Sequence, residues 1–141
     1  MANLTFEQLE PIKLPLVQRF YKQYYPSAKP KRDEEIFVAK VDNIICAAVR
    51  YRNIDGFNLL TGLAVAHEHR LKGIGHQLCL HSLPLVRNPK IYCFAFEDLE
   101  SYYQKIGFET CDSSSLPAPL KGPFERYTQS GKQLIAMQYL D

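Results

Sequence analysis

The fold is decided by one stretch in which the apolar pattern changes from that of a strand to that of a helix: Leu63-Ala64-Val65-Ala66-His67-Glu68-His69-Arg70-Leu71-Lys72-Gly73-Ile74-Gly75-His76-Gln77-Leu78. The run from Phe57 to Ala66, after the Asp55-Gly56 turn, predicts a strand. From Gly73 the apolar residues recur at helical spacing until Pro84, which has no N–H and predicts the end of the helix. A strand, a loop and a helix therefore follow one another here.

The loop between this strand and helix has the features of an anion-binding site. The first N–H groups of a helix have no acceptor in the preceding turn, and the helix dipole adds partial positive charge there. Gly73 and Gly75 have no Cβ to keep a phosphate away from the backbone. Arg70 can make a forked contact with a phosphate, and Lys72 adds a mobile charge. The loop is predicted to bind a diphosphate; a simple tight bend is the alternative.

The spacing of these residues excludes two common phosphate-binding motifs. The Walker pattern GxxxxGK followed by Ser or Thr does not occur in the sequence, and the dinucleotide pattern GxGxxG fails because position 78 is Leu78. The pattern that fits is Arg70-x-x-Gly73-x-Gly75. It resembles the acyl-CoA signature of the GNAT family of N-acetyltransferases.

A second motif strengthens this resemblance. Tyr103-Gln104-Lys105-Ile106-Gly107-Phe108 resembles the family's Tyr-x-Lys-x-Gly-Phe segment and begins 33 residues after Arg70. The resemblance spans residues 36–108 and extends loosely to the C-terminal strand. It implies an α+β (α/β mixed) fold, with a central mixed, mostly antiparallel β-sheet flanked by helices and a splayed strand that forms a cofactor cleft. The length of 141 residues also predicts one domain, residues 1–141.

Apolar periodicity predicts the other elements. The Asp42-Asn43 dipeptide, whose residues tolerate a positive φ, predicts a tight hairpin. The segment Ser27–Glu35 is rich in Pro and charge and is expected to be a solvated loop, and no element is assigned to the Ser- and Pro-rich segment Ser113–Pro123. The predicted strands are Asn3–Leu9, Ile36–Val41, Ile44–Tyr51, Ile91–Phe96 and Leu134–Leu140, and the predicted helices are Leu16–Tyr25 and Glu97–Ile106.

The resemblance also implies a cofactor and its contacts. The family uses acetyl-CoA, and the expected cofactor-binding residues are Leu63, Ala64, Val65, Arg70, Leu71, Lys72, Gly73, Ile74 and Gly75. The strand residues would lie along the pantetheine arm, and the loop residues would surround the pyrophosphate. Tyr103 matches the family tyrosine that can protonate the departing thiolate. Tyr103 also shares a helical face with Leu99 and Ile106, although Tyr102 is the stronger candidate for the core.

The family implies direct attack of an acceptor amine on the thioester, with the Val65 amide as the candidate for stabilising the oxyanion. The attacking amine must lose a proton, and Glu68, His67 and Glu97 are the candidate bases. Glu68 is placed in the catalytic set, although a solvated or capping role is the alternative. The chain departs from the family at Phe96, where many members carry Asn seven residues before the tyrosine.

Composition and charge limit the other functions. A hydrophobic content of 46% and a charged content of 23% indicate a packed globule, and a net charge of +2 disfavours a dedicated nucleic-acid binder. The sequence has neither a bilayer-spanning apolar run nor a secretion signal, so we expect a cytoplasmic protein without a membrane partner. No metal site is expected, because neither the cysteines nor the histidines have ligand spacing.

The acceptor cannot be named from the sequence beyond an amine-bearing substrate. The segments at residues 27–35 and 111–132 are expected to border its site. A possible homodimer could form by pairing of the apolar final strand. Two alternatives remain: a noncatalytic acyl-CoA sensor or interaction module, and a general interaction protein in which the glycine-rich loop is only a bend.

Overall fold

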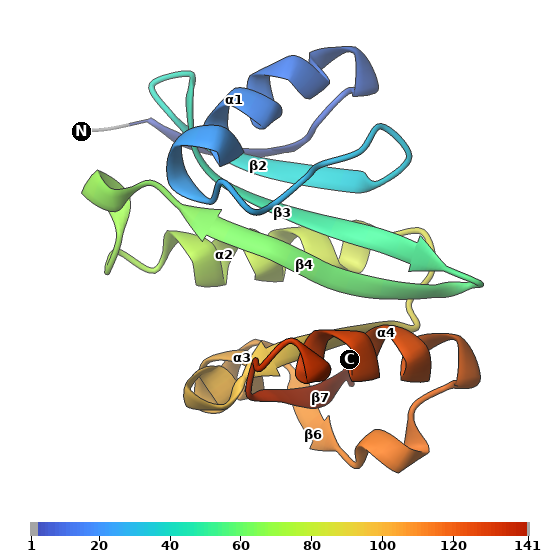
Figure 1. Cartoon of the computed structure of the whole chain (residues 1–141). Coiled ribbons are helices and arrows are strands. Elements are labelled where there is room, and N and C mark those ends of the chain that lie inside the picture. The colour runs from blue at the N-terminus through green and yellow to red at the C-terminus, as the bar shows by residue number, and fades with distance from the viewer. Residues whose placement is uncertain (1–2, 141) are drawn as a thin grey trace. The chain divides into compact units, whose positions relative to one another are not determined.

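The computed structural model describes residues 3–140, in which seven strands are hydrogen-bonded in the order β1-β2-β3-β4-β5-β7-β6. The β4–β5 pair is parallel, whereas the pairs β1–β2, β2–β3, β5–β7 and β6–β7 are antiparallel. The predicted α+β class with a mixed, mostly antiparallel sheet is therefore confirmed (Figure 1). The elements are β1 (Leu4–Gln8), α1 (Leu14–Tyr24), β2 (Glu35–Val41), β3 (Ile44–Ile54), β4 (Phe57–Val65), α2 (Ile74–Ser82), β5 (Ile91–Phe96), α3 (Glu100–Ile106), β6 (Phe108–Cys111), α4 (Ala118–Gln129) and β7 (Leu134–Tyr139).

The chain forms two compact units. The first comprises Met1–Arg52 and Thr61–Arg87, and the second comprises Asn53–Leu60 and Asn88–Asp141. One boundary falls within β3 and another within β4, so both strands contribute residues to both units. The expectation of one domain over residues 1–141 stays a prediction.

Tight turns connect β2 to β3 and β3 to β4 where the sequence predicts them. Asp42 and Asn43 between β2 and β3 have φ values of 50° and 69°, and Asp55 and Gly56 between β3 and β4 have values of 48° and 90°. Two consecutive residues with positive φ match the right-handed twist of a hairpin, and Asp, Asn and Gly tolerate that conformation. The strands β2 and β3 pair antiparallel, with an irregularity between Ala39 and Lys40.

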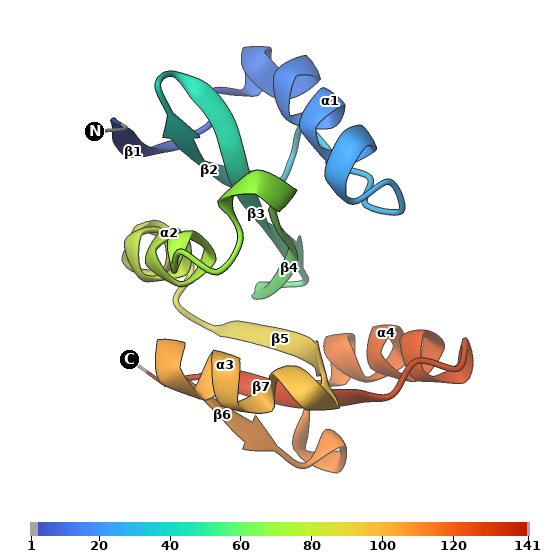
Figure 2. The same ribbon diagram turned by 90° about the vertical axis from the view of Figure 1, so that its left-hand side faces the viewer.

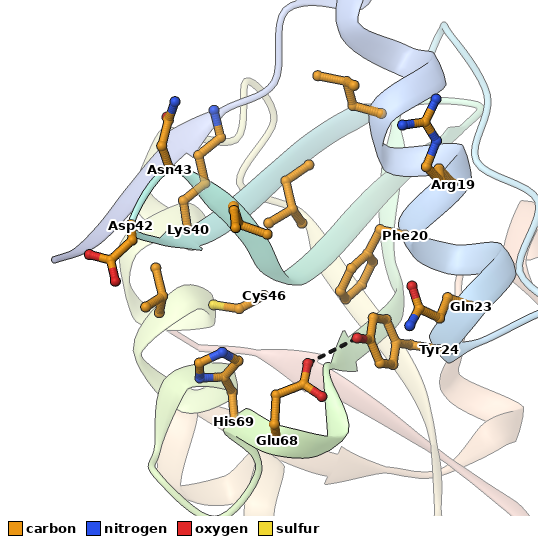
Figure 3. A pocket seen from close by; sticks show the side chains of 14 residues that line it. Arg19, Phe20, Gln23, Tyr24, Lys40, Asp42, Asn43, Cys46, Glu68 and His69 are labelled. Atoms are coloured by element: carbon orange, nitrogen blue, oxygen red, sulfur yellow. Dashed lines mark hydrogen bonds between the residues drawn. The ribbon is translucent and has the colours of Figure 1, made fainter. Parts of the chain in front are cut away.

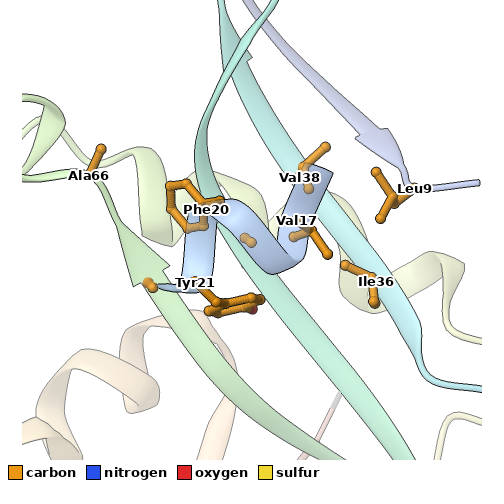
Figure 4. Packing of buried hydrophobic residues seen from close by; sticks show 9 residues of the cluster. Leu9, Val17, Phe20, Tyr21, Ile36, Val38 and Ala66 are labelled. Carbon is orange, nitrogen blue, oxygen red and sulfur yellow. The ribbon is translucent and has the colours of Figure 1, made fainter. Parts of the chain in front are cut away.

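Helix α1 covers one face of the strands in the first unit. Its residues Val17, Phe20 and Tyr21 are buried, as the three- and four-residue spacing predicts. They pack in a cluster that includes Ile36 and Val38, which share one face of β2, whereas the buried Phe37 and Ala39 lie on its opposite face (Figure 4). The predicted helix over Leu16–Tyr25 is thus confirmed, with its start two residues earlier.

Helix α2 lies on the other side of these strands (Figure 2). Phe37, which follows Ile36 and so points to the opposite face, packs edge-on against Tyr51 with ring centroids 5.8 Å apart. The Tyr51 hydroxyl is hydrogen-bonded to Ser82 Oγ of α2 at 2.7 Å. This buried contact attaches the end of α2 to the sheet and so fixes the direction of the helix.

In the second unit β7 is a central strand. It pairs with β5 on one edge and with β6 on the other. The expectation that the final strand pairs across a dimer is therefore wrong, because both of its hydrogen-bonding edges are occupied within the chain. The sequence pattern shows that a strand is apolar but does not show which strands end the sheet.

Helix α4 covers part of the segment to which the sequence assigned no element. Leu116 and Leu120 are buried against Leu59, Tyr92 and Ala136. The prolines obscure this helix in the sequence. One proline stands in the first turn, where its missing N–H costs nothing, but Pro123 lies inside the helix, where a proline is normally unfavourable.

Candidate functional site

The end of β4 is held firmly before the chain enters the glycine-containing loop. Ala64 and Ala66 are buried in the cluster below α1, and the Ala66 N–H donates to the Cys46 carbonyl at 2.8 Å. Leu63 and Val65 alternate with these alanines and are half-buried, so they present the opposite face of the strand. A short 3-10 turn, His67–His69, follows.

Two residues in left-handed conformation turn the chain from this point into α2. Leu71 has φ 65° and is fully exposed, and Gly73 has φ 76°. A leucine in this region is strained, because its Cβ approaches the following carbonyl oxygen. A Cβ added at Gly73 would meet nothing closer than Gln77 Nε2 at 4.0 Å. Glycine is therefore favoured at this position by its positive φ, and the space beside its Cα is open. Such space suits close approach of a ligand to the backbone.

The N-terminus of α2 has the features of an anion-binding site. The Gln77 N–H donates to the Gly73 carbonyl at 3.0 Å, so the N–H groups of Ile74, Gly75 and His76 precede this bond. Among the described residues no side chain caps this end, and none in its first turn is acidic. Ile74 and Gly75 are buried, which fixes the direction in which the uncapped end points. The predicted site therefore keeps its positive helix end available.

Arg70 is oriented by the strand that precedes it. Its Nε donates to the Val65 carbonyl at 3.1 Å. The two terminal guanidinium nitrogens can then make a forked contact with a phosphate, and the exposed Lys72 follows two residues later. The Val65 carbonyl accepts this bond, and its oxygen has a second lone pair for another donor.

Glu68 is bound by a residue that the sequence did not single out. The Tyr24 hydroxyl of α1 donates to Glu68 Oε1 at 2.9 Å. This bond is the main reason why the pKa of Glu68 lies below its usual value; a backbone hydrogen bond and the nearby His69 and His67 act in the same direction. The same bond raises the pKa of Tyr24. A lowered pKa makes Glu68 a weaker proton acceptor and a more persistent anion.

We expect Tyr24→Phe to raise the pKa of Glu68, because the substitution removes the largest cause of the lowering. Since the folded-state pKa is the lower one, stabilisation through this carboxylate is present above its unfolded-state pKa and is lost as the pH falls through the folded-state value. A carbon-detected NMR titration of the Glu68 carboxyl measures the change. Tyr25→Phe, at the residue that directly follows α1, is the matched control and should leave the titration unchanged. An identical pKa in both variants contradicts the assignment.

Tyr103, the expected acid, lies in the second unit. It is buried, with 8% of its surface exposed, and its ring packs edge-on against Phe108 at 5.8 Å. The neighbouring Tyr102 is half-buried, so the expectation that Tyr102 is the stronger core candidate is wrong. Leu99, expected on the same inward face, is 39% exposed, because a 3-10 turn at Glu97–Leu99 precedes the α-helix and changes the angular spacing. The role of the Tyr103 hydroxyl as the acid stays a prediction.

Three of the four cysteines, Cys46, Cys79 and Cys93, are buried, and Cys111 is half-buried. Burial raises the pKa of Cys79 to about 12 and also raises the pKa of Cys46 and Cys111. These three thiols are therefore poor nucleophiles.

Residues 3–140 contain no group of three or more His, Cys, Asp or Glu side chains that could hold a metal ion. In this same range we find no helix with the length and apolar character needed to cross a membrane.

Comparisons with known proteins agree with the geometry of the loop. The model of the acetyltransferase (GNAT) domain matches residues 32–110, which include both the Arg70–Gly75 loop and the motif at Tyr103. This match covers more than half of the sequence, and the chain belongs to the GNAT acetyltransferase family. No curated protein sequence matches the chain.

Solved structures share the fold at low sequence identity. N-acetylglutamate synthase from Neisseria gonorrhoeae, complexed with coenzyme A and N-acetyl-glutamate, has a TM-score of 0.71 and 13% identity; the similarity covers 100% of this chain but 36% of that one. The ribosomal-protein-S18-alanine N-acetyltransferase from Escherichia coli has a TM-score of 0.67 and 13% identity, with 97% and 93% covered. Rv2747 from Mycobacterium tuberculosis, in complex with CoA, has a TM-score of 0.73 and 13% identity, with 97% and 99% covered. The chain thus spans about a third of the synthase.

Proposed function

We propose that this chain is an acetyl-CoA-dependent N-acetyltransferase that moves an acetyl group to a primary amine by direct attack in a ternary complex. The observation that carries the proposal is the loop from Arg70 to Gly75, which combines an oriented guanidinium with an uncapped helix N-terminus. Membership of the GNAT family and the coenzyme A bound to two of the similar structures support acetyl-CoA as the cofactor.

The residues present fit this cofactor. The open space beside Gly73 lets a diphosphate reach the backbone N–H groups of Ile74 and Gly75, with Arg70 and Lys72 supplying positive charge. Leu71 lies in the same loop, and the half-buried Leu63 and Val65 flank Ala64 on the strand that leads to it. These strand residues would lie along the pantetheine arm. Acetyl-CoA, when bound, supplies a thioester whose carbonyl carbon an amine can attack.

Side chains of this protein must then carry out two proton transfers. Glu68 is the candidate that accepts a proton from the amine, directly or through a water, although its lowered pKa limits its strength as a base. Tyr103 is the candidate that donates a proton to the departing thiolate. The raised pKa of Cys79 supports direct attack over a relay through an acyl-cysteine.

The experiment that tests this proposal is a screen of primary amines with acetyl-CoA that reports release of free coenzyme A. We expect release with at least one amine class, together with thermal stabilisation of the protein by coenzyme A. Stabilisation without release from a broad panel would instead identify an acyl-CoA sensor. No stabilisation at saturating coenzyme A would contradict cofactor binding altogether.

We expect Tyr103→Phe to lower kcat by roughly 100-fold, as loss of a general acid does, while the affinity for coenzyme A changes little. Steady-state kinetics together with titration of coenzyme A separates the two effects. Tyr102→Phe is the matched control, because it removes a hydroxyl from the adjacent residue. If Tyr103→Phe keeps full turnover, Tyr103 is a core residue.

A further inference from the structure

A cavity of about 650 Å³ in the first unit is not used by the proposed cofactor loop (Figure 3). It lies between α1, the turn that joins β2 to β3, and the 3-10 turn that carries Glu68 and His69. Its volume is within the range of cavities that hold small organic ligands. Its apolar lining comes from Leu16, Phe20, Val41, Ile44, Ile45 and Cys46.

The charged side chains that line the cavity differ in their ion-pair and hydrogen-bond partners. Lys40 Nζ lies 3.1 Å from Glu7 Oε1, and Asp42 Oδ1 accepts the Asn3 N–H at 3.2 Å. The ion pairs found within residues 3–140 do not include Glu68, whose bonded partner at this site is the neutral Tyr24 hydroxyl. Glu68 therefore brings a negative charge to the cavity without a basic side chain paired to it.

Aromatic rings stand next to this carboxylate. The Tyr24 ring lies between Phe20, at 5.0 Å, and His67, at 5.6 Å between ring centroids. In Figure 3 the Tyr24 hydroxyl and the Glu68 carboxylate meet at the wall of the cavity, and the Phe20 ring lies beside them. A carboxylate beside aromatic rings is suited to a cationic ammonium group, which both attract.

We propose that this cavity binds the acceptor, a primary ammonium group on an apolar body of arylalkyl size. The ammonium contacts Glu68 Oε2 or Oε1, and the apolar body covers Phe20 and Ile45. Glu68 lies two residues before Arg70, so the amine is held by the segment that leads directly into the cofactor loop. The role of this ligand as an acceptor rests on the proposed acetyltransferase function, but its binding to the cavity can be measured whether or not the protein is an acetyltransferase.

The lining disfavours other amines. An α-amino acid would bring a second carboxylate close to Glu68, and like charges at short range repel. Arg19, on the α1 wall, is exposed and keeps its charge in water.

The test is direct binding of three probes to the full chain, followed by NMR: 2-phenylethylamine, its uncharged analogue 2-phenylethanol, and phenylalanine. We expect 2-phenylethylamine to bind best and to shift the amide signals of Cys46 and His69. Glu68→Gln keeps an acceptor for the Tyr24 hydroxyl but removes the charge, and it should weaken 2-phenylethylamine at least 10-fold while 2-phenylethanol is unaffected. Equal affinity of 2-phenylethylamine for the wild type and Glu68→Gln, or no binding at all, overturns the proposal.

A second pair of variants tests the location. Gln23 lines the cavity from the exposed side of α1, so Gln23→Trp should fill it and abolish binding of both neutral and charged probes. Gln18→Trp is the matched control, because Gln18 is exposed on the same helix and does not line the cavity. Binding that survives Gln23→Trp overturns the proposed location.

The outcomes separate this inference from the proposed function. If coenzyme A is released with some amine but the KM for that amine is the same in the wild type and Gln23→Trp, the acetyltransferase stands and the cavity is not its acceptor site. If 2-phenylethylamine binds in the cavity but no amine is acetylated, the binding site stands and the proposed function fails.

Discussion

The Gly73→Asp variant is expected to lose at least 100-fold of its affinity for coenzyme A while remaining folded. Aspartate places a negative charge at the N-terminus of α2, where the diphosphate is proposed to bind, and it fills the open space beside the backbone. A 100-fold loss corresponds to about 2.7 kcal/mol, which repulsion by a full charge in direct contact can supply. The fold should tolerate the change, because Asp is among the residues that adopt a left-handed conformation most readily and nothing lies within reach of the new Cβ.

Isothermal titration of coenzyme A into each variant measures this effect, and urea unfolding measures stability. Gly73→Asn is the matched control, because Asn has nearly the same shape and conformational tolerance without the charge. We expect Gly73→Asn to bind considerably more tightly than Gly73→Asp. Equal affinities would show that charge at position 73 does not matter and would remove the diphosphate from this helix end.

The site could be predicted from sequence where it is contiguous. Arg70, Gly73 and Gly75 lie within six residues, and backbone geometry alone brings them to one turn. The same holds for the hairpin at Asp42 and Asn43, because turn conformation depends on local residues. By contrast, Tyr24 and Glu68 are 44 residues apart and come together only through the packing of α1.

Helix α4 and the position of β7 were missed for a related reason. Leu116 and Leu120 bury their side chains against Leu59 and Tyr92, and this tertiary packing overrides the unfavourable effect of Pro123 within the helix. No local pattern reveals that β7 is inserted between β5 and β6, because strand order depends on contacts between distant residues. Local sequence signals therefore predict the cofactor loop, whereas helix α4 and the order of the strands depend on long-range packing.

The charged segment before β2 also depends on packing between distant residues. The sequence predicts a solvated loop in this segment, but the structure places one of its charges in a buried ion pair. The side chain of Glu34 in this segment is 4% exposed and pairs with that of Arg50, which is 8% exposed, with Glu34 Oε1 2.9 Å from Arg50 Nη1. The guanidinium also donates to the Lys29 carbonyl at 3.0 Å and lies over the Tyr21 ring at 5.4 Å. The sequence shows charges in this segment but cannot show that one of them has a buried partner on β3.

We expect Glu34→Gln to lower the free energy of unfolding by about 3 kcal/mol, at the lower end of the cost of leaving one charge of a buried pair uncompensated. Glutamine keeps a hydrogen-bond acceptor but no negative charge, so the Arg50 guanidinium stays buried without its counter-ion. The orphaned charge also matters for the site, because Arg50 packs against Gly62 of β4. A Cβ at Gly62 would lie 2.7 Å from Arg50 Nε, and the Gly62 carbonyl accepts from the Tyr21 hydroxyl at 2.6 Å.

Urea unfolding of the full chain measures the loss. Glu10→Gln is the control, because Glu10 pairs with Lys13 at 3.5 Å on the surface, where the two side chains are 68% and 38% exposed. Removing an exposed partner should change stability by less than about 1 kcal/mol. If Glu34→Gln costs no more than Glu10→Gln, water reaches Arg50 in solution and the pair does not hold the segment before β2 against the strands. A large difference instead means that burial, and not the number of ion pairs, decides how much a charge contributes here.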